Sequence, residues 1–106
     1  MNSKNFSKSS RFPSTGPAER AKELAVLALL HLAKDRELIA RFLAETGFEA
    51  ADLRRMTGEP GFASAMLDYI CSKEPLLTAF TADQGIDPAE PETARQYLAS
   101  IGSRET

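Results

Sequence analysis

The sequence predicts an all-α protein, a compact bundle of five to six short helices. Apolar residues recur three and four positions apart, as on one face of a helix, and no useful stretch alternates apolar and polar residues as a half-buried strand does. The 106 residues, 42% hydrophobic and 26% charged, suit one globular domain. We expect a disordered basic tail at 1–16, a single helical domain at 17–102 and a frayed C-terminus at 103–106.

The tail, residues 1–16, differs from the rest of the chain in composition. It contains three cations, five serines and no acid. Such a segment buries too little apolar surface to offset the entropy lost on ordering, so it is expected to be disordered. It also lacks the apolar stretch of a secretory signal. Because the whole chain has a net charge of −2, the body that follows this basic tail is acidic.

The first three helices have recognisable ends. Proline suits the first position of a helix, and Ala, Leu, Glu and Lys dominate the segment from Pro17 to Ala33. A second helix is expected after Asp35, whose carboxylate can cap free amide groups, and it should end at Gly47 in the left-handed conformation. A short third helix is expected at about 50–56, before Gly58.

Proline and glycine also delimit the remaining helices. The fourth helix should follow Pro60, and the fifth should run from Pro75 to Gly85. The sixth is expected to end at Gly102. In each of them the apolar residues lie at helical spacing, which predicts one face directed at a shared core.

The first helix is apolar on more than one face. One stripe consists of Leu24, Leu27, Ala28 and Leu32, and a second of Val26, Leu29, Leu30 and Ala33. A helix that is apolar nearly all round must be buried nearly all round. Either this helix is central and the last helix covers its second stripe, or Val26 and Leu30 meet their copies across a homodimer axis. We favour the central position and the monomer.

The chain resembles itself at an offset of 38 residues. Six positions are identical, among them Leu38 with Leu76, Phe42 with Phe80, and Gly47 with Gly85. A duplicated helix–turn–helix unit explains these matches, and so do two unrelated amphipathic helix pairs with glycine caps. Under either interpretation both Leu/Phe stripes should face the core and both glycines should have a positive φ.

The same residues carry a family resemblance. They are the apolar run Leu24–Leu32, Asp35-x-x-Leu38-x-x-x-Phe42-x-x-x-x-Gly47-Phe48, Gly58-x-Pro60, Leu67-Asp68-Tyr69-Ile70 and Glu74-x-Leu76-x-x-x-Phe80-x-x-x-x-Gly85-Ile86-x-Pro88. In this pattern the chain resembles a group of short α-proteobacterial proteins, domain of unknown function 3572, over roughly residues 18–98. The resemblance implies a bacterial cytoplasmic protein without an assigned activity, and it transfers no functional residue.

Acidic residues gather around the two glycine turns. The candidate interaction surface consists of Glu45, Glu49, Asp52, Asp83 and Asp87. Glu45 and Asp83 fall in the last turns of their helices, where the helix dipole disfavours negative charge, and this repeated cost is one argument for a surface that binds a basic partner, although we give it less weight than the alternative. The alternative is that these are ordinary surface acids, with Glu49 and Asp87 capping the helices that follow.

A nucleic-acid interface is the second function considered. The segment 43–56 has the spacing of a helix-turn-helix motif. The candidate contacts are Lys4, Lys8 and Arg11 in the tail and Arg54 and Arg55 on the expected reading helix. Glu49 and Asp52 would repel the phosphates there, so we place this function behind a protein-interaction module.

Groups suited to catalysis are few. His31, the single histidine, lies on a leucine-rich helix face, and Cys71 ends a helix, where the dipole does not lower a thiol pKa. One cysteine and one histidine make neither an internal disulfide nor a structural zinc site, which fits a reducing cytoplasm. We therefore expect no enzyme, cofactor or metal, no membrane span, and a non-catalytic protein-interaction module with an unidentified protein partner.

Overall fold

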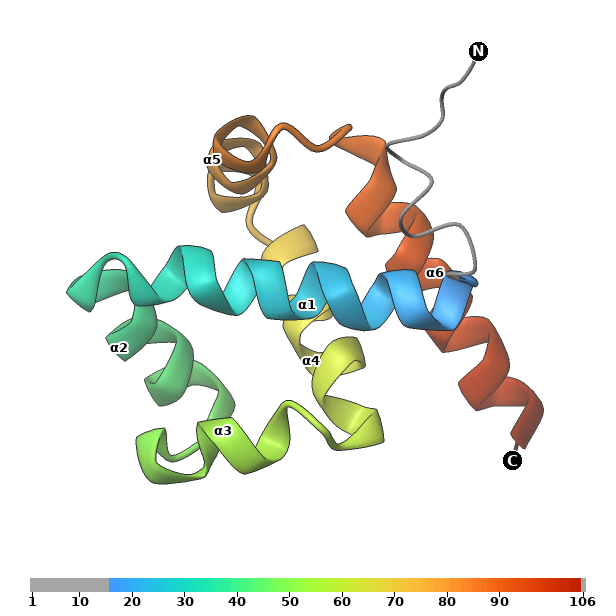
Figure 1. Cartoon of the computed structure of the whole chain (residues 1–106), viewed down its shortest axis with the longest axis horizontal. Helices are drawn as coiled ribbons and strands as arrows, with labels where there is room; N and C mark the ends of the chain where they lie inside the picture. Colours follow the sequence, from blue (N-terminus) through green and yellow to red (C-terminus); the bar gives the residue numbers. More distant parts are fainter. Residues whose placement is uncertain (1–15, 106) are drawn as a thin grey trace, which may run out of the picture.

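Six α-helices and one short 3-10 turn make up the part of the chain that this computed structural model describes, residues 16–105 (Figure 1). In chain order they are α1 (Pro17–Ala33), α2 (Arg36–Thr46), the 3-10 turn (Ala50–Asp52), α3 (Leu53–Met56), α4 (Pro60–Cys71), α5 (Glu74–Gln84) and α6 (Ala89–Glu105). No strand occurs between residues 16 and 105, and the predicted all-α class is confirmed. Of the tail expected to be disordered, residues 1–16, all but Gly16 lie outside the described residues, and Gly16 is the N-cap residue of α1.

Local capping explains both ends of α2 and the C-terminal end of α5. The carboxylate of Asp35 accepts hydrogen bonds from the backbone N–H groups of Glu37 at 2.9 Å and Leu38 at 3.4 Å, which satisfies free donors at the start of α2. Gly47 and Gly85 end α2 and α5 with φ values of 82° and 68°, as predicted. Glu49, by contrast, makes no side-chain capping bond.

The last helix does not end where the sequence predicts. It continues through Gly102 to Glu105. Among the described glycines only Gly47 and Gly85 have a positive φ. A glycine ends a helix only when it takes the left-handed conformation, and a glycine inside a helix costs only about 1 kcal/mol relative to alanine.

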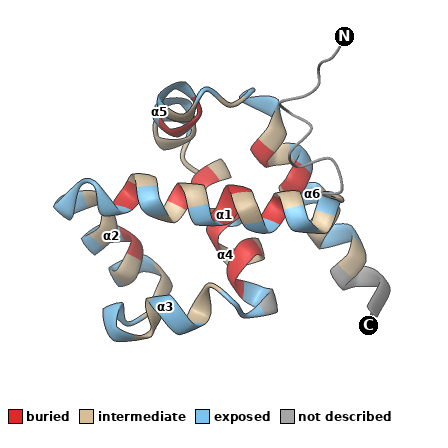
Figure 2. Ribbon diagram, in the orientation of Figure 1, coloured by how far each residue is buried: buried red, intermediate tan, exposed pale blue. Residues whose placement is uncertain are grey.

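Helix α1 is central, as expected, and crosses the molecule with α4 and α6 packed against it (Figure 1). Its buried residues are Ala21, Leu24, Ala25, Ala28 and Leu32. Figure 2 shows the buried residues gathering where α1 and α4 cross. Phe62, near the start of α4, joins this core and is 2% exposed. The crossing of these two helices therefore organises the core.

The second apolar stripe of α1 is only partly covered, which corrects the expectation that α6 buries it. Leu29 packs against the core, but Val26 and Leu30 are 37% and 54% exposed. Helix α6 reaches the face of α1 that carries Ala21 and Leu24 instead. Two exposed apolar side chains are common on a monomer surface, so this face by itself requires no partner.

The two glycine-ended helices are structurally equivalent, as the internal repeat predicts. Phe42 on α2 and Phe80 on α5 are both fully buried in one core cluster. Leu38 and Leu76, one turn earlier, are half-buried against the same cluster. Helix α2 packs on α1, whereas α5 packs mainly on α4, so the two equivalent helices are supported by different neighbours.

None of the helices within residues 16–105 is long and apolar enough to cross a membrane.

Candidate functional site

A groove lies between α2 and α5, with the end of α4 as its floor. Its lining residues are Leu38, Arg41, Tyr69, Ser72, Lys73, Glu74, Pro75, Leu76 and Ala79. The volume of about 540 Å³ is within the range of pockets that hold a ligand or several side chains of a peptide. The groove therefore brings α2 together with α4 and α5, two consecutive helices that lie farther along the chain.

Local sequence features set the two walls of the groove. The break at Lys34 and the cap at Asp35 turn the chain from α1 into α2, which places Leu38 and Arg41 on one wall. On the other side, α5 starts at Glu74 immediately after the link that follows α4. Because α2 packs on α1 and α5 packs mainly on α4, the leucine stripes of both helices are only half-buried and contribute apolar surface to the groove.

Tyr69 is the most buried polar side chain of the groove, only 8% exposed. Its ring meets Phe42 edge-on, with the ring centroids 5.0 Å apart. Its hydroxyl makes no hydrogen bond to any residue between 16 and 105. Burial raises the pKa of Tyr69, and the nearby charge of Glu45 raises it further. The phenol is therefore a protonated donor, and a buried hydroxyl of this kind normally finds an acceptor.

Two cations border this tyrosine. The ammonium of Lys73 lies 5.0 Å from the centroid of the Tyr69 ring and 3.0 Å from Oε1 of Glu45. Arg41 is exposed, and its positive charge lowers the pKa of Tyr69. Within the described part of the chain the guanidinium of Arg41 forms no salt bridge. Lys73 is therefore already engaged by Tyr69 and Glu45, whereas Arg41 is available to a ligand.

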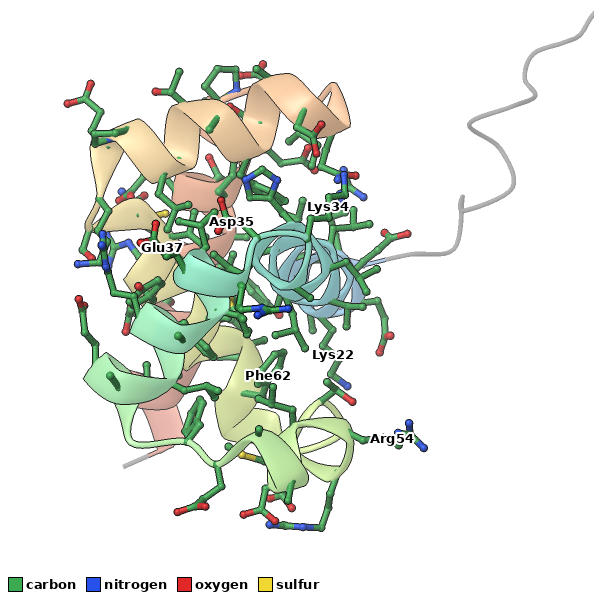
Figure 3. All side chains as sticks on the ribbon, turned by 90° about the vertical axis from the view of Figure 1, so that its left-hand side faces the viewer. Lys22, Lys34, Asp35, Glu37, Arg54 and Phe62 are labelled. Carbon is green, nitrogen blue, oxygen red and sulfur yellow. The ribbon has the colours of Figure 1, made fainter. Side chains whose placement is uncertain are left out.

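Two of the five predicted interaction acids hold helices together. Glu45, in the last turn of α2, pairs with Lys73 beyond the end of α4. Asp83, in the last turn of α5, accepts a hydrogen bond from Nζ of Lys34 at 2.9 Å, and its carboxylate lies 3.2 Å from Nδ1 of His31 (Lys34 is labelled in Figure 3). These contacts lower the pKa of Asp83. Cross-helix pairing offsets the unfavourable helix-end positions of both acids.

The other three acids lie in two separate places. Asp52 is 3.3 Å from Arg55 one turn along, and Glu49 beside it is exposed. Asp87 caps α6 by accepting a hydrogen bond from the N–H of Ala89 at 2.9 Å. Figure 1 places the segment before α3 and the α5–α6 connection on opposite sides of α1. The predicted acids therefore do not form one continuous surface, and their role in binding stays a prediction.

The predicted nucleic-acid contacts lie apart from the groove. Lys4, Lys8 and Arg11 are outside the described residues. Arg54 points away from the body of the molecule (Figure 3). Arg55 is 3.3 Å from both Asp52 and Glu59. The expected reading helix consists of a 3-10 turn and the four residues of α3, which is short for a helix that must lie in a DNA groove.

His31 and Cys71, the two residues considered for catalysis, have surroundings typical of residues that stabilise a fold. The His31 side chain is only 12% exposed, forms a hydrogen bond with Asp83 and meets the ring of Phe80 edge-on, with the ring centroids 5.7 Å apart. Burial, together with the neighbouring Glu92, raises the pKa of the Cys71 thiol to about 11, so the nucleophilic thiolate is scarce near neutral pH. Among residues 16–105 no group of three potential ligands is placed to hold a metal ion.

Sequence reasoning did not find the groove. The repeat pairs Leu38 with Leu76, which indicated two equivalent helices but not the space between them. The helical spacing of apolar residues predicts that Tyr69 is one more core residue of α4, and it predicts that Arg41 is an ordinary charged residue on the surface. Arg41 and Lys73 come close to Tyr69 only in the folded chain, so no local sequence pattern identifies them as a pair.

The comparisons with known proteins identify the family. A family model described as "Protein of unknown function (DUF3572)" matches residues 18–100, which is most of the chain. No curated protein and no solved structure matches it. The family match agrees with the resemblance carried by the capping glycines and core leucines of the two repeated units. The chain therefore belongs to the DUF3572 family.

Proposed function

We propose that the protein is a non-catalytic protein-interaction module that binds a segment of a partner protein in the groove between α2 and α5. The observation that carries this proposal is the groove itself: apolar walls around a buried tyrosine hydroxyl and an arginine that are both free of partners within residues 16–105. Interaction sites combine apolar surface with a few convergent polar groups, and this groove has that composition.

A non-catalytic role is supported by the surroundings of the reactive side chains. His31 is engaged by Asp83, and the thiol of Cys71 has its pKa raised to about 11. Neither residue lines the groove. The family resemblance seen in the sequence favours a bacterial protein, and the single cysteine is compatible with a reducing cytoplasm. We therefore propose the bacterial cytoplasm as its location.

The groove has better support as an interaction site than the other two candidates. Four of the five predicted acids already have partners within the fold, which leaves Glu49 as the exception. For nucleic acid, Arg55 is engaged by two carboxylates, and α3 has a single turn. No observation favours nucleic-acid binding as a second function.

Site-specific photo-crosslinking tests the proposal. A benzoylphenylalanine at Ala79, which is exposed and lines the groove, should form an adduct with a second protein in the producing cell. The same group at Ala99, exposed on α6, is the matched control and should not. The captured protein, once purified, should shift amide resonances of α2 and α5 in the wild-type chain. Equal adducts at both positions, or shifts outside these helices, contradict the proposal.

A further inference from the structure

Resting on the proposed function, we infer that the groove takes an acidic, apolar peptide segment: a large apolar side chain of the partner sits between Leu38 and Leu76, and an adjacent Asp or Glu carboxylate binds the Tyr69 hydroxyl and the Arg41 guanidinium. The inference joins two observations made on different elements. One is the apolar pair of walls, and the other is the pair of donors beside it, Tyr69 and Arg41, which have no acceptor among the described residues.

The apolar part of the groove is suited to one large side chain. Leu38 and Leu76 are half-buried, so each leaves part of its surface facing the space between the helices. Ala79, exposed one turn beyond Leu76, leaves room on the α5 wall. An apolar side chain that covers the two leucines is removed from water together with their exposed surfaces, and this burial of apolar area favours binding.

The polar part of the groove selects an acceptor with negative charge. The hydroxyl of Tyr69, 8% exposed, donates to no residue between 16 and 105, so it needs an acceptor from solvent or from a ligand. Arg41 contributes a positive charge that no salt bridge within those residues neutralises. A carboxylate satisfies both, because hydrogen bonds to an ionised acceptor are about twice as strong as neutral ones.

The charges around the groove also restrict the occupant. Lys73 is already paired with Glu45, and Glu74 brings a carboxylate to the start of α5. A second acid on the partner near Glu74 would be repelled, so the preferred segment places its acid toward α2. The chain's own basic tail, with Lys4, Lys8 and Arg11, has the wrong sign for Arg41 and is not the expected occupant.

Fluorescence anisotropy with defined peptides tests the inference. The probe is a set of fluorescein-labelled dodecapeptides, each with one Leu or Phe flanked by Asp or Glu in an otherwise Gly/Ser sequence. We expect micromolar binding for the best members of the set. Replacing each acid by its amide should weaken binding about tenfold or more, since a bond to a charged group is lost. Decanoate serves as a small-molecule carboxylate and should bind more weakly than the peptides.

Three variants locate the binding. Tyr69→Phe removes only the hydroxyl, which bonds to nothing within the described residues, so it should preserve folding and weaken acidic peptides about tenfold. Arg41→Glu should weaken them further. Arg54→Glu makes the same change of charge at an exposed position that points away from the body and should leave binding unchanged. Circular dichroism confirms that each variant is helical.

The outcomes separate this inference from the proposed function. Equal binding of acidic and amide peptides, or equal effects of Arg41→Glu and Arg54→Glu, overturns the acidic preference. Decanoate binding without peptide binding overturns the peptide as occupant. An adduct at Ala79 without acidic-peptide binding overturns the inference while the interaction module stands. An adduct between two copies of this chain at Ala79 identifies self-association and overturns the partner peptide.

Discussion

Replacing three glycines by alanine gives a test of the helix ends with an internal control of opposite sign. Gly47 and Gly85 end α2 and α5 with φ values of 82° and 68°. An added Cβ at either position would meet no atom within 4 Å, so the cost comes from the backbone conformation and not from a clash. At Gly61, inside α4, the space is equally open, and φ lies outside the left-handed region.

The magnitudes follow from these conformations. An L-residue in the left-handed region costs about 1–2 kcal/mol, partly offset because alanine lowers the entropy of the unfolded chain. We expect Gly47→Ala and Gly85→Ala each to lower the free energy of unfolding by about 1 kcal/mol. Gly61→Ala gains from the same unfolded-state effect without strain and should raise the free energy of unfolding by about 0.5 kcal/mol.

Urea denaturation followed by far-UV circular dichroism measures all three variants. The transition midpoint should fall for Gly47→Ala and Gly85→Ala and should stay or rise for Gly61→Ala, with the same slope m throughout. If either cap variant is as stable as Gly61→Ala, left-handed glycine does not end that helix. If only one of the two is destabilised, the structural equivalence of α2 and α5 is refuted.

Three further predictions concern the core, the charge pairs and the exposed face of α1. Phe42→Ala and Phe80→Ala, at two fully buried positions, should each lower the free energy of unfolding by about 3–5 kcal/mol in urea denaturation, and a loss under about 1 kcal/mol would place that ring outside the core. A hydrogen bond from Arg95 lowers the pKa of Glu92 from 4.5 to about 2, so the stability that this carboxylate contributes is full above pH 4.5 and is lost as the pH falls toward 2. Glu92→Gln should therefore flatten that part of the acid unfolding curve. An unchanged curve would show that the pair of Glu92 and Arg95 does not stabilise the fold. The double change Val26→Glu with Leu30→Glu should alter the free energy of unfolding by no more than about 0.5 kcal/mol, because both side chains are exposed. Light scattering should give a mass of 11.6 kDa for the wild type, and twice that mass would refute the monomer.

The sequence by itself predicts the helices and most of their ends. Asp35 caps α2, and Gly47 and Gly85 end α2 and α5 in the predicted conformation. These features can be predicted because capping and helix propensity act over four or five neighbouring residues. The buried positions of Phe42 and Phe80 also follow from local periodicity, which specifies the face of a helix that meets the core.

Local rules fail where the deciding neighbour is distant in sequence. Gly102 is a residue type that often ends a helix, yet α6 continues past it because no left-handed turn forms there. The spacing of Val26 and Leu30 is typical of a buried helix face, yet both are exposed because α6 packs on another face of α1. Periodicity identifies an apolar face but does not say which neighbour covers it, since that depends on how all the helices share the core.

Only the tertiary structure decides the candidate site. Arg41, Tyr69 and Leu76 belong to three different helices, and nothing in the local pattern of any one of them distinguishes a groove residue from a core or surface residue. The same holds for the bond from Arg20 to Glu90, which joins α1 to α6 at 2.6 Å across 70 positions. Helix formation is local because its hydrogen bonds close within one turn, whereas a groove exists only where separately supported helices leave space between them.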